Sequence, residues 1–425
     1  MRLSIPKIAG IVVVAVATTL LGVNLFSNGQ KKITSRVEHR YDVASPQFVR
    51  SMGVLLGPPL VGGNRTQTLL NGDEIFPSML QAIGSARRTI NFETYIYWSG
   101  RIGKAFADAL SERARAGVQV HILLDWVGSQ KMDKAQLQQM IDSGVDIRRY
   151  HPLHWYTIDR VNNRTHRKLL VVDGRIGFTG GVGIADEWTG HAQDPQHWRD
   201  THFRIEGPAV AQMQAAFADN WTKVSGVVLH GEEYFPAIEP RGEQMAQVFK
   251  SSIEGGAESI HLMYLAAIAA ARESIDLSMA YFVPDEVALE TLEAAMKRGV
   301  KVRIIMPGPH TDAALVRRAS RALWGRVLAG GAEMYEYQPT MYHCKVLVVD
   351  GLWVSVGSTN FDPRSFRLND EANLNVYDRE FARRQRADFE NDLARSRRIT
   401  YDDWMNRPWP EKAWERFAAL FGAQL

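Results

Sequence analysis

The chain has 425 residues, of which 45% are hydrophobic and 23% are charged, values typical of a globular protein with a sizeable core. The net charge of +3 at pH 7 excludes a protein that binds nucleic acid through strong bulk positive charge, although a local basic patch stays open. Cys344 is the only cysteine, so no intrachain disulfide can form.

The first 32 residues differ from the rest in composition. The stretch from Ile8 to Phe26 is apolar, and no charge falls between Lys7 and Lys31. Such a stretch spans about 28 Å as a helix at ~1.5 Å per residue, close to the hydrocarbon thickness of a bilayer. No clear Ala-x-Ala cleavage site follows, so residues 1–32 are predicted to form an uncleaved, single-pass membrane anchor. Basic residues flank both ends, so the side of the membrane is not predicted.

The remainder of the chain repeats itself. Two pairs of segments are alike, namely Ala82–Gly100 with Ala267–Asp285, and Ala109–Ser129 with Thr291–Thr311. In the second pair, a charged helix ends at Gly117 or Gly299, and a strand follows at residues 118–124 or 300–306. The offset between the halves is 299 − 117 = 182 for these glycines and 343 − 166 = 177 for two histidines. These similar offsets predict an internal duplication.

Helices alternate with strands in each half, which is typical of an α/β protein whose helices cover a sheet. We predict two pseudo-symmetric domains, each a mixed β-sheet flanked by helices, at residues 33–235 and 236–425, after the anchor at residues 1–32. The boundary falls in residues 225–243, which are rich in Gly, Pro and Glu. Residues 67–72 and 247–252 are predicted to be the first strands of the two domains. The tail after Arg379 is predicted to be helical and packed on the second domain.

A His-x-Lys-x4-Asp unit occurs once in each half: His166, Lys168 and Asp173, then His343, Lys345 and Asp350. Residues two apart on a strand share a face, so the His and Lys of each unit point the same way. In both units Gly follows the Asp, which indicates a turn. The apolar runs before that turn fit a sheet that is buried on both faces.

Paired His and Lys side chains suit phosphodiester chemistry. Zinc is a poor fit because ammonium is no ligand, and neither a serine nucleophile elbow nor a complete dinucleotide loop is present. Two ammonium groups neutralise the charge that grows on phosphorus oxygens. One neutral imidazole attacks phosphorus while the other protonates the leaving oxygen, roles that suit a pKa near 6.5. Neither a metal nor another cofactor is expected.

With these units, the chain resembles the phospholipase D superfamily, and within it the bacterial cardiolipin synthase branch. The doubled unit is the superfamily signature, and residues 197–210 and 357–378 resemble the surroundings found in cardiolipin synthases. The resemblance implies an active site between the two domains, with His166 as nucleophile and His343 as general acid and base. It also implies roles for other residues: phosphate binding by Lys168, Lys345 and Asn360, and a turn-forming role for Asp173 and Asp350.

Further site residues are predicted around these motifs. Gly183 stands where the family often has Asn, so the phosphate contacts should be asymmetric, and Gly181 and Ser358 are assigned to substrate binding or orientation. Each histidine needs an orienting acid. The candidates are Asp200, 200 − 166 = 34 residues after the first histidine, and Glu371, 371 − 343 = 28 residues after the second.

Other polar residues have two interpretations each. His151 and His154 line the pocket mouth or face solvent. The arginines on one helix, Arg317, Arg318, Arg321 and Arg326, meet anionic headgroups or form a solvated helix face. Cys344 alternates with the active face and is interpreted as a small buried residue.

Phosphatidyl transfer is the favoured function: a phosphatidyl-histidine forms from one phosphatidylglycerol, and the hydroxyl of a second lipid resolves it to cardiolipin. The alternatives are hydrolysis by a phospholipase D, a membrane-tethered nuclease, and a non-catalytic lipid-binding scaffold. The expected partners are a phospholipid membrane, namely the bacterial inner membrane, and an anionic glycerophospholipid substrate. No nucleic-acid partner is expected. Transfer versus hydrolysis, the second lipid, acyl preference, protein partners and oligomeric state stay open.

Overall fold

The computed structural model describes residues 33–152, 162–252, 259–420 and 422, together with residues 7, 10, 12, 14–19 and 22. His154 and most of the predicted anchor lie outside the described residues. Within this described part of the chain, no helix is both long and apolar enough to cross a bilayer. The anchor therefore stays a prediction.

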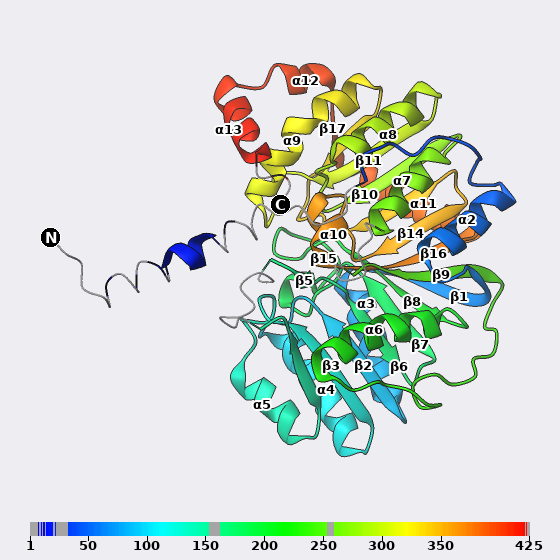
Figure 1. Cartoon of the computed structure of the whole chain (residues 1–425), viewed down its shortest axis with the longest axis vertical. Coiled ribbons are helices and arrows are strands. Elements are labelled where there is room, and N and C mark those ends of the chain that lie inside the picture. Colours follow the sequence, from blue (N-terminus) through cyan, green and yellow to red (C-terminus); the bar gives the residue numbers. More distant parts are fainter. Residues whose placement is uncertain are drawn as a thin grey trace.

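A single mixed sheet runs through the molecule, as Figure 1 shows. Among the described residues it has fifteen strands. In sheet order these are β17 (Ser396–Ile399), β12 (Glu333–Tyr337), β11 (Lys301–Pro307), β10 (Ser274–Met279), β13 (Lys345–Val349), β14 (Trp353–Gly357), β16 (Ala372–Tyr377), β9 (Gln244–Lys250), β1 (Val61–Leu70), β8 (Thr201–Glu206), β7 (Ile176–Gly180), β6 (Leu169–Val172), β2 (Thr89–Thr94), β3 (Gln119–Asp125) and β4 (Asp146–Tyr150).

The two halves of this sheet order their strands in the same way. In the first half, three strands are parallel (β2, β3 and β4), and four more continue the sheet antiparallel (β6, β7, β8 and β1). The second half repeats this order, with β10, β11 and β12 parallel and β13, β14, β16 and β9 antiparallel. The structure differs from the predicted separate sheets, because β1 pairs with β9 and joins the halves. Each is the edge strand of its half, and pairing satisfies edge backbone groups that would otherwise be exposed. The predicted domain limits stay a prediction.

Helices cover both faces of the sheet. On one face lie α6 (Val210–Ser225) and α11 (Arg379–Leu393), which share a core with both halves of the sheet. The opposite face is covered by α2 (Pro46–Leu56), α3 (Asn71–Ser85), α4 (Arg101–Arg115), α5 (Lys134–Asp142), α7 (Ser259–Ala269), α8 (Glu286–Lys297) and α9 (Ala314–Ala329). Shorter elements are α12 (Tyr401–Met405) and α13 (Trp409–Ala419), which pack on α9, and α10 (Pro363–Arg367), β5 (Arg164–Thr165), β15 (Asn369–Asp370) and the 3₁₀ helix η2 (Asp186–Trp188).

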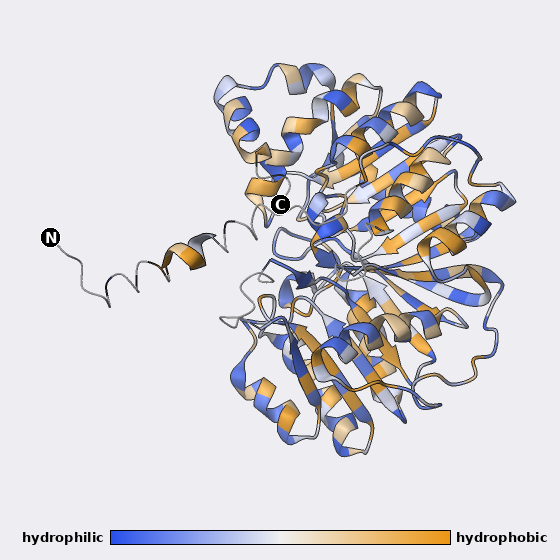
Figure 2. Cartoon of the chain, in the orientation of Figure 1, coloured by the Kyte–Doolittle hydropathy of each residue, from blue (hydrophilic) through white to orange (hydrophobic). Residues whose placement is uncertain are grey.

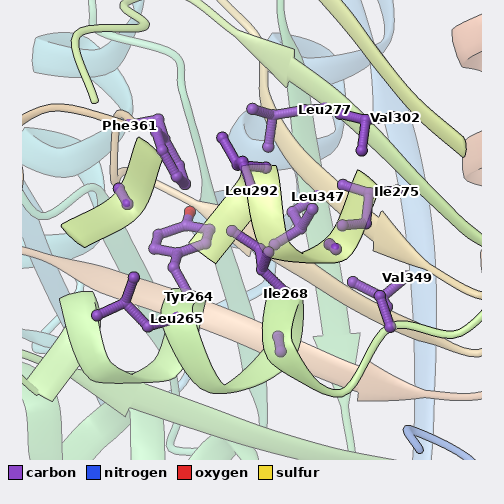
Figure 3. Close-up of a cluster of buried hydrophobic side chains, with 14 of the residues drawn as sticks. Tyr264, Leu265, Ile268, Ile275, Leu277, Leu292, Val302, Leu347, Val349 and Phe361 are labelled. Carbon is purple, nitrogen blue, oxygen red and sulfur yellow. The ribbon is translucent and has the colours of Figure 1, made fainter. Parts of the chain in front are cut away.

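The apolar runs after the two His-Lys units are buried on both faces. In β6, Leu169 and Val171 belong to the core beneath α6, whereas Leu170 and Val172 belong to the core on the other face. The strands are accordingly among the most hydrophobic parts of the chain in Figure 2. Figure 3 shows the corresponding cluster in the second half, where Leu347 of β13 meets Ile268 of α7. Successive side chains enter different cores because they alternate across a strand.

Two sequence predictions need correction. Strands are predicted at residues 67–72 and 247–252, but β1 ends at Leu70, where Asn71 begins α3, and β9 ends at Lys250. A Cβ on Gly72 would lie 2.2 Å from the Trp188 carbonyl oxygen, so the helix starts where only glycine fits. The tail after Arg379 is not wholly helical, because β17 pairs antiparallel with β12 and covers that edge of the sheet.

Candidate active site

The first His-Lys unit is held against the opposite half of the molecule. Immediately before it, β5 pairs in parallel with β15, and the His166 N–H donates to the Asp370 carbonyl oxygen at 2.9 Å. The Lys168 Nζ donates to the His166 carbonyl oxygen at 2.9 Å, so both side chains lie on the same side of the strand. The Tyr95 ring centroid is 5.7 Å from that nitrogen.

The second unit is held in the corresponding way. The His343 N–H donates to the Arg199 carbonyl oxygen at 2.8 Å, and the Arg199 N–H donates to the Met341 carbonyl oxygen at 2.9 Å. The Lys345 Nζ donates to the His343 carbonyl oxygen at 2.8 Å. Each histidine is therefore fixed by main-chain pairing between the two halves.

Each histidine is oriented by an acid from the other half. The Nδ1 of His166 lies 2.9 and 3.0 Å from the two carboxylate oxygens of Glu371, and the Nδ1 of His343 lies 2.7 Å from Asp200 Oδ2. Both acids are fully buried. The sequence predicts that each acid orients the histidine of its own half, and this pairing is wrong because the structure crosses the pairs. The crossing follows from the main-chain pairing, because His166 bonds to Asp370 and His343 bonds to Arg199, the residues directly before the two acids.

The aspartates of the two units shape hairpins away from the histidines. Asp173 and Asp350 have positive φ angles of 52 and 53°, and the glycines after them have 60 and 56°. Two successive residues with positive φ are what tight hairpins require. Each carboxylate accepts three consecutive backbone N–H groups: residues 87–89 for Asp173 and residues 272–274 for Asp350. These aspartates tie each hairpin to the start of the neighbouring strand.

The residues that close the two motifs differ between the halves. A Cβ on Gly181 would lie 2.3 Å from Asp200 Oδ1, so this glycine makes room for the acid. Its counterpart Ser358 instead donates its hydroxyl to Glu371 at 2.5 Å. A Cβ on Gly183 would lie 2.7 Å from the Ile96 Cβ, whereas Asn360 at the corresponding position faces the cavity. The first half therefore has no space for Asn at this position, and the asymmetry of the phosphate contacts stays a prediction.

Both histidines open into one cavity of about 410 Å³. Of the predicted site residues, His166, Lys168, His343 and Asn360 line it, while the two acids and Lys345 are outside its wall and contact the histidine rings. The sequence did not identify several of its wall residues: Tyr95, Ile96, Trp98, Arg164, Trp188, Trp198, Tyr281, Asp312, Asp362, Arg364 and Asn369. Of these, only Arg164 had a local signal, because it lies two residues before His166 and so on the same side.

Burial and nearby charges favour a neutral imidazole at His166, and Asp200 opposes their effect at His343. Burial, followed by the charges of Lys168 and Lys345, lowers the pKa of His166 well below its usual value. Burial and Lys345 also lower the pKa of His343, although Asp200 opposes them. Burial likewise lowers the pKa of both lysines. A neutral His166 imidazole has a free lone pair, and an anion bound beside the two lysines would favour their charged form.

The remaining candidates lie outside the cavity wall. His151 stacks on Tyr150 with ring centroids 4.1 Å apart. Arg317, Arg321 and Arg326 form ion pairs with glutamates, and Arg318 lies 5.7 Å from the Trp414 ring centroid. Cys344 is buried, with its Sγ 3.8 Å from the Arg199 carbonyl oxygen.

Comparison with known proteins places this site in a family context. Residues 79–221 and 264–393 match the family described as "Cardiolipin synthase, PLD-like domain". The chain is 36% identical over 347 residues to cardiolipin synthase 2 of Bacillus anthracis, a match covering 80% of this chain and 67% of that protein. It is 34% identical over 370 residues to a cardiolipin synthase of Geobacillus kaustophilus, covering 86% and 74%.

A solved structure shares the fold. Phosphatidylserine synthase of Haemophilus influenzae Rd KW20 superposes with a TM-score of 0.65 and covers 88% of this chain and 99% of its own. Its sequence identity is 14%, so this likeness concerns the fold alone.

Proposed function

The chain belongs to the cardiolipin synthase family of proteins with phospholipase-D-like domains, and we propose that it converts two molecules of phosphatidylglycerol into cardiolipin and glycerol. The observation that carries the proposal is the pair of histidines, each held through Nδ1 by a buried carboxylate beside a shared cavity. Such a hydrogen bond fixes the orientation of each ring and leaves its Nε2 atom to react with the substrate.

In the first step, His166 Nε2 attacks the phosphorus of one phosphatidylglycerol. The bond between phosphorus and the glycerol oxygen breaks, and that oxygen takes a proton from His343. The product of this step is a phosphatidyl-histidine plus free glycerol. Lys168, Lys345 and Asn360 bind the non-bridging oxygens, where ammonium and amide groups stabilise the growing negative charge.

In the second step, a hydroxyl of another phosphatidylglycerol attacks the same phosphorus. His343, now neutral, accepts the hydroxyl proton, and the bond between phosphorus and nitrogen breaks to release His166 and cardiolipin. Using one group first as an acid and then as a base follows from the symmetry of the two displacements. With water as the attacking group, the same site would yield phosphatidic acid.

Product analysis tests the reaction. The full-length protein in phosphatidylglycerol vesicles, with the headgroup glycerol labelled, is expected to release one labelled glycerol for each cardiolipin formed, as measured by mass spectrometry. Phosphatidic acid as the main product would replace transfer by hydrolysis. Cleavage of single-stranded DNA with no lipid product would replace both by a nuclease.

The proposed substrate lies in a membrane, and the relatives are named for a lipid product. If residues 1–32 anchor the chain, a lipid reaches the cavity by lateral diffusion at high effective concentration. Deletion of these residues is then expected to lower the rate on intact vesicles much more than on detergent-dispersed phosphatidylglycerol. An equal loss on both would contradict the anchoring role.

A further inference from the structure

One wall of the cavity carries an acid that the proposed chemistry does not use. Asp312 lies in the loop between β11 and α9, is exposed, and lines the cavity together with Tyr281. The Tyr281 hydroxyl donates to both carboxylate oxygens of Asp312, at 2.8 and 2.7 Å. Burial and this acid keep the pKa of Tyr281 well above its usual value, so the phenol stays a donor.

This acid lies on the side of the cavity that belongs to His343. The Tyr281 ring stands nearly perpendicular to the His343 imidazole, with centroids 6.4 Å apart. Trp188 and Trp198 contact the same imidazole, at 5.3 and 5.6 Å. In an in-line displacement started by His166, the leaving oxygen and whatever is attached to it lie towards His343. Asp312 is therefore placed beside the leaving headgroup rather than beside the attacked phosphorus.

A carboxylate at the mouth of a phosphate site has an electrostatic disadvantage, since it repels the anion that the lysines attract. Its partner is a neutral phenol, so the charge is held in place without being neutralised. An ionised carboxylate offers about four acceptor positions, and Tyr281 takes only one hydrogen to share between its oxygens. The remaining positions suit a group that donates hydrogen bonds.

We propose that Asp312, positioned by Tyr281, forms a subsite that selects headgroups with free hydroxyl groups. Glycerol bound to phosphate has two hydroxyls that can donate to the carboxylate. The same subsite would receive the glycerol of the second lipid, because that group occupies the place left by the first. The inference rests on the proposed function and goes beyond it by assigning the recognition of the glycerol to these two residues.

The test compares two donor lipids that differ only in headgroup hydroxyls. Phosphatidylglycerol and phosphatidyl-1-propanol have the same acyl chains and the same headgroup length, and the rate of headgroup release is measured for each with the full-length protein in vesicles. The wild-type protein is expected to prefer phosphatidylglycerol roughly 10- to 100-fold in kcat/KM, as expected for hydrogen bonds to a charged acceptor. Asp312→Asn should reduce that preference to less than about 3-fold, mainly through a lower kcat/KM for phosphatidylglycerol.

Two further variants separate recognition from structure. Tyr281→Phe removes the hydroxyl but keeps the ring. It should cause a partial loss of the preference, because Asp312 is no longer held in position. Asp142→Asn removes a negative charge from an exposed residue of α5 that does not line the cavity, and it should leave the preference unchanged. The inference is overturned if Asp312→Asn keeps the wild-type preference, or if its kcat/KM values for both donor lipids fall by the same factor. The proposed function would stand in either case.

A measurement on the wild-type protein covers the case in which the variant does not fold. Labelled glycerol and 1-propanol compete as acceptors in the presence of phosphatidylglycerol, and the labelled phospholipids are counted. Glycerol is expected to be incorporated at least 10-fold more often at equal concentration, the lower end of the same range. Equal incorporation overturns the hydroxyl subsite. If the wild-type protein turns over neither donor lipid, the proposed function itself is wrong.

Discussion

The two histidine–carboxylate pairs are built alike in their main chains but differ around the acid. Asp200 accepts the Trp188 Nε1–H at 2.9 Å and the Thr201 N–H at 2.8 Å, in addition to its contact with His343. Glu371 accepts the Ser358 hydroxyl at 2.5 Å and the Asn369 amide at 3.3 Å, in addition to its contact with His166.

Charge widens this difference. Burial raises the pKa of Glu371 to about 7, although Lys168 and Ser358 oppose it. For Asp200, burial also acts to raise the pKa, but the charges of His343 and Lys345 outweigh it and the pKa is lowered. Glu371 therefore holds a proton more readily than Asp200 does. An anion stabilises a neighbouring imidazolium, so the comparison supports His343 as the proton donor and His166 as the neutral nucleophile.

Removing the proposed nucleophile has the largest expected effect. His166→Ala should lower cardiolipin formation by about 10⁴-fold or more and should leave no labelled phosphatidyl group on the protein, because the bond to phosphorus cannot form. The measurement is lipid turnover together with mass spectrometry of the trapped protein. An acid-labile, base-stable phosphate on His343 would reverse the two roles.

Removing the proposed proton donor should separate the two steps. His343→Asn is expected to slow turnover by about 10²- to 10⁴-fold, the usual contribution of general acid–base catalysis. The covalent adduct on His166 should then accumulate, because attack on phosphorus can precede the missing proton transfer while its resolution lacks a base. Quenching at short times and counting labelled protein checks this. A variant with no adduct at any time would contradict it.

The two acids should differ in size of effect and in pH dependence. Asp200→Asn is expected to lower kcat by about 10²- to 10⁴-fold at every pH from 6 to 8, because the wild-type acid is ionised throughout. Glu371→Gln should lower kcat by about 10-fold near pH 8. The loss in kcat should be smaller below pH 7, where the wild-type glutamate becomes neutral and resembles the variant. The measurement is kcat of the wild-type protein and of both variants as a function of pH from 6 to 8. Equal, pH-independent losses would remove the distinction between the pairs.

Local features of these pairs could be predicted from the sequence, and long-range ones could not. His166 and Lys168 are two residues apart on a strand, and Asp173 precedes a glycine, so their placement follows from alternation and turn chemistry. Which acid serves which histidine depends on β5 pairing with β15 and on residue 199 pairing with residue 342. These contacts join segments far apart in the chain, and no local pattern encodes them.

The cavity wall was missed for the same reason. Trp188 ends η2 and Trp198 lies in the segment after it, both in the first half, yet they pack against His343 of the second. Asp312 and Tyr281 form their hydrogen bond although they are 31 residues apart in the chain. The joining of the halves by β1 and β9 was likewise not visible, because an edge strand has the same alternating pattern whether or not it finds a partner.

The smallest expected effect concerns the hydroxyl that distinguishes Glu371 from Asp200. Ser358 donates to Glu371 and so stabilises its ionised form, and Ser358→Ala should raise the pKa of Glu371 further. Activity that requires the ionised acid increases with pH through this pKa, so its midpoint should move to higher pH by about 0.5 to 1 unit, the equivalent of one ordinary hydrogen bond. Trp188→Phe is the matched control, because it removes a donor to Asp200 instead and should leave the midpoint in place. A midpoint that moves with Trp188→Phe and not with Ser358→Ala would show that the pH dependence belongs to the His343 pair, and the assignment of the two roles would have to be exchanged.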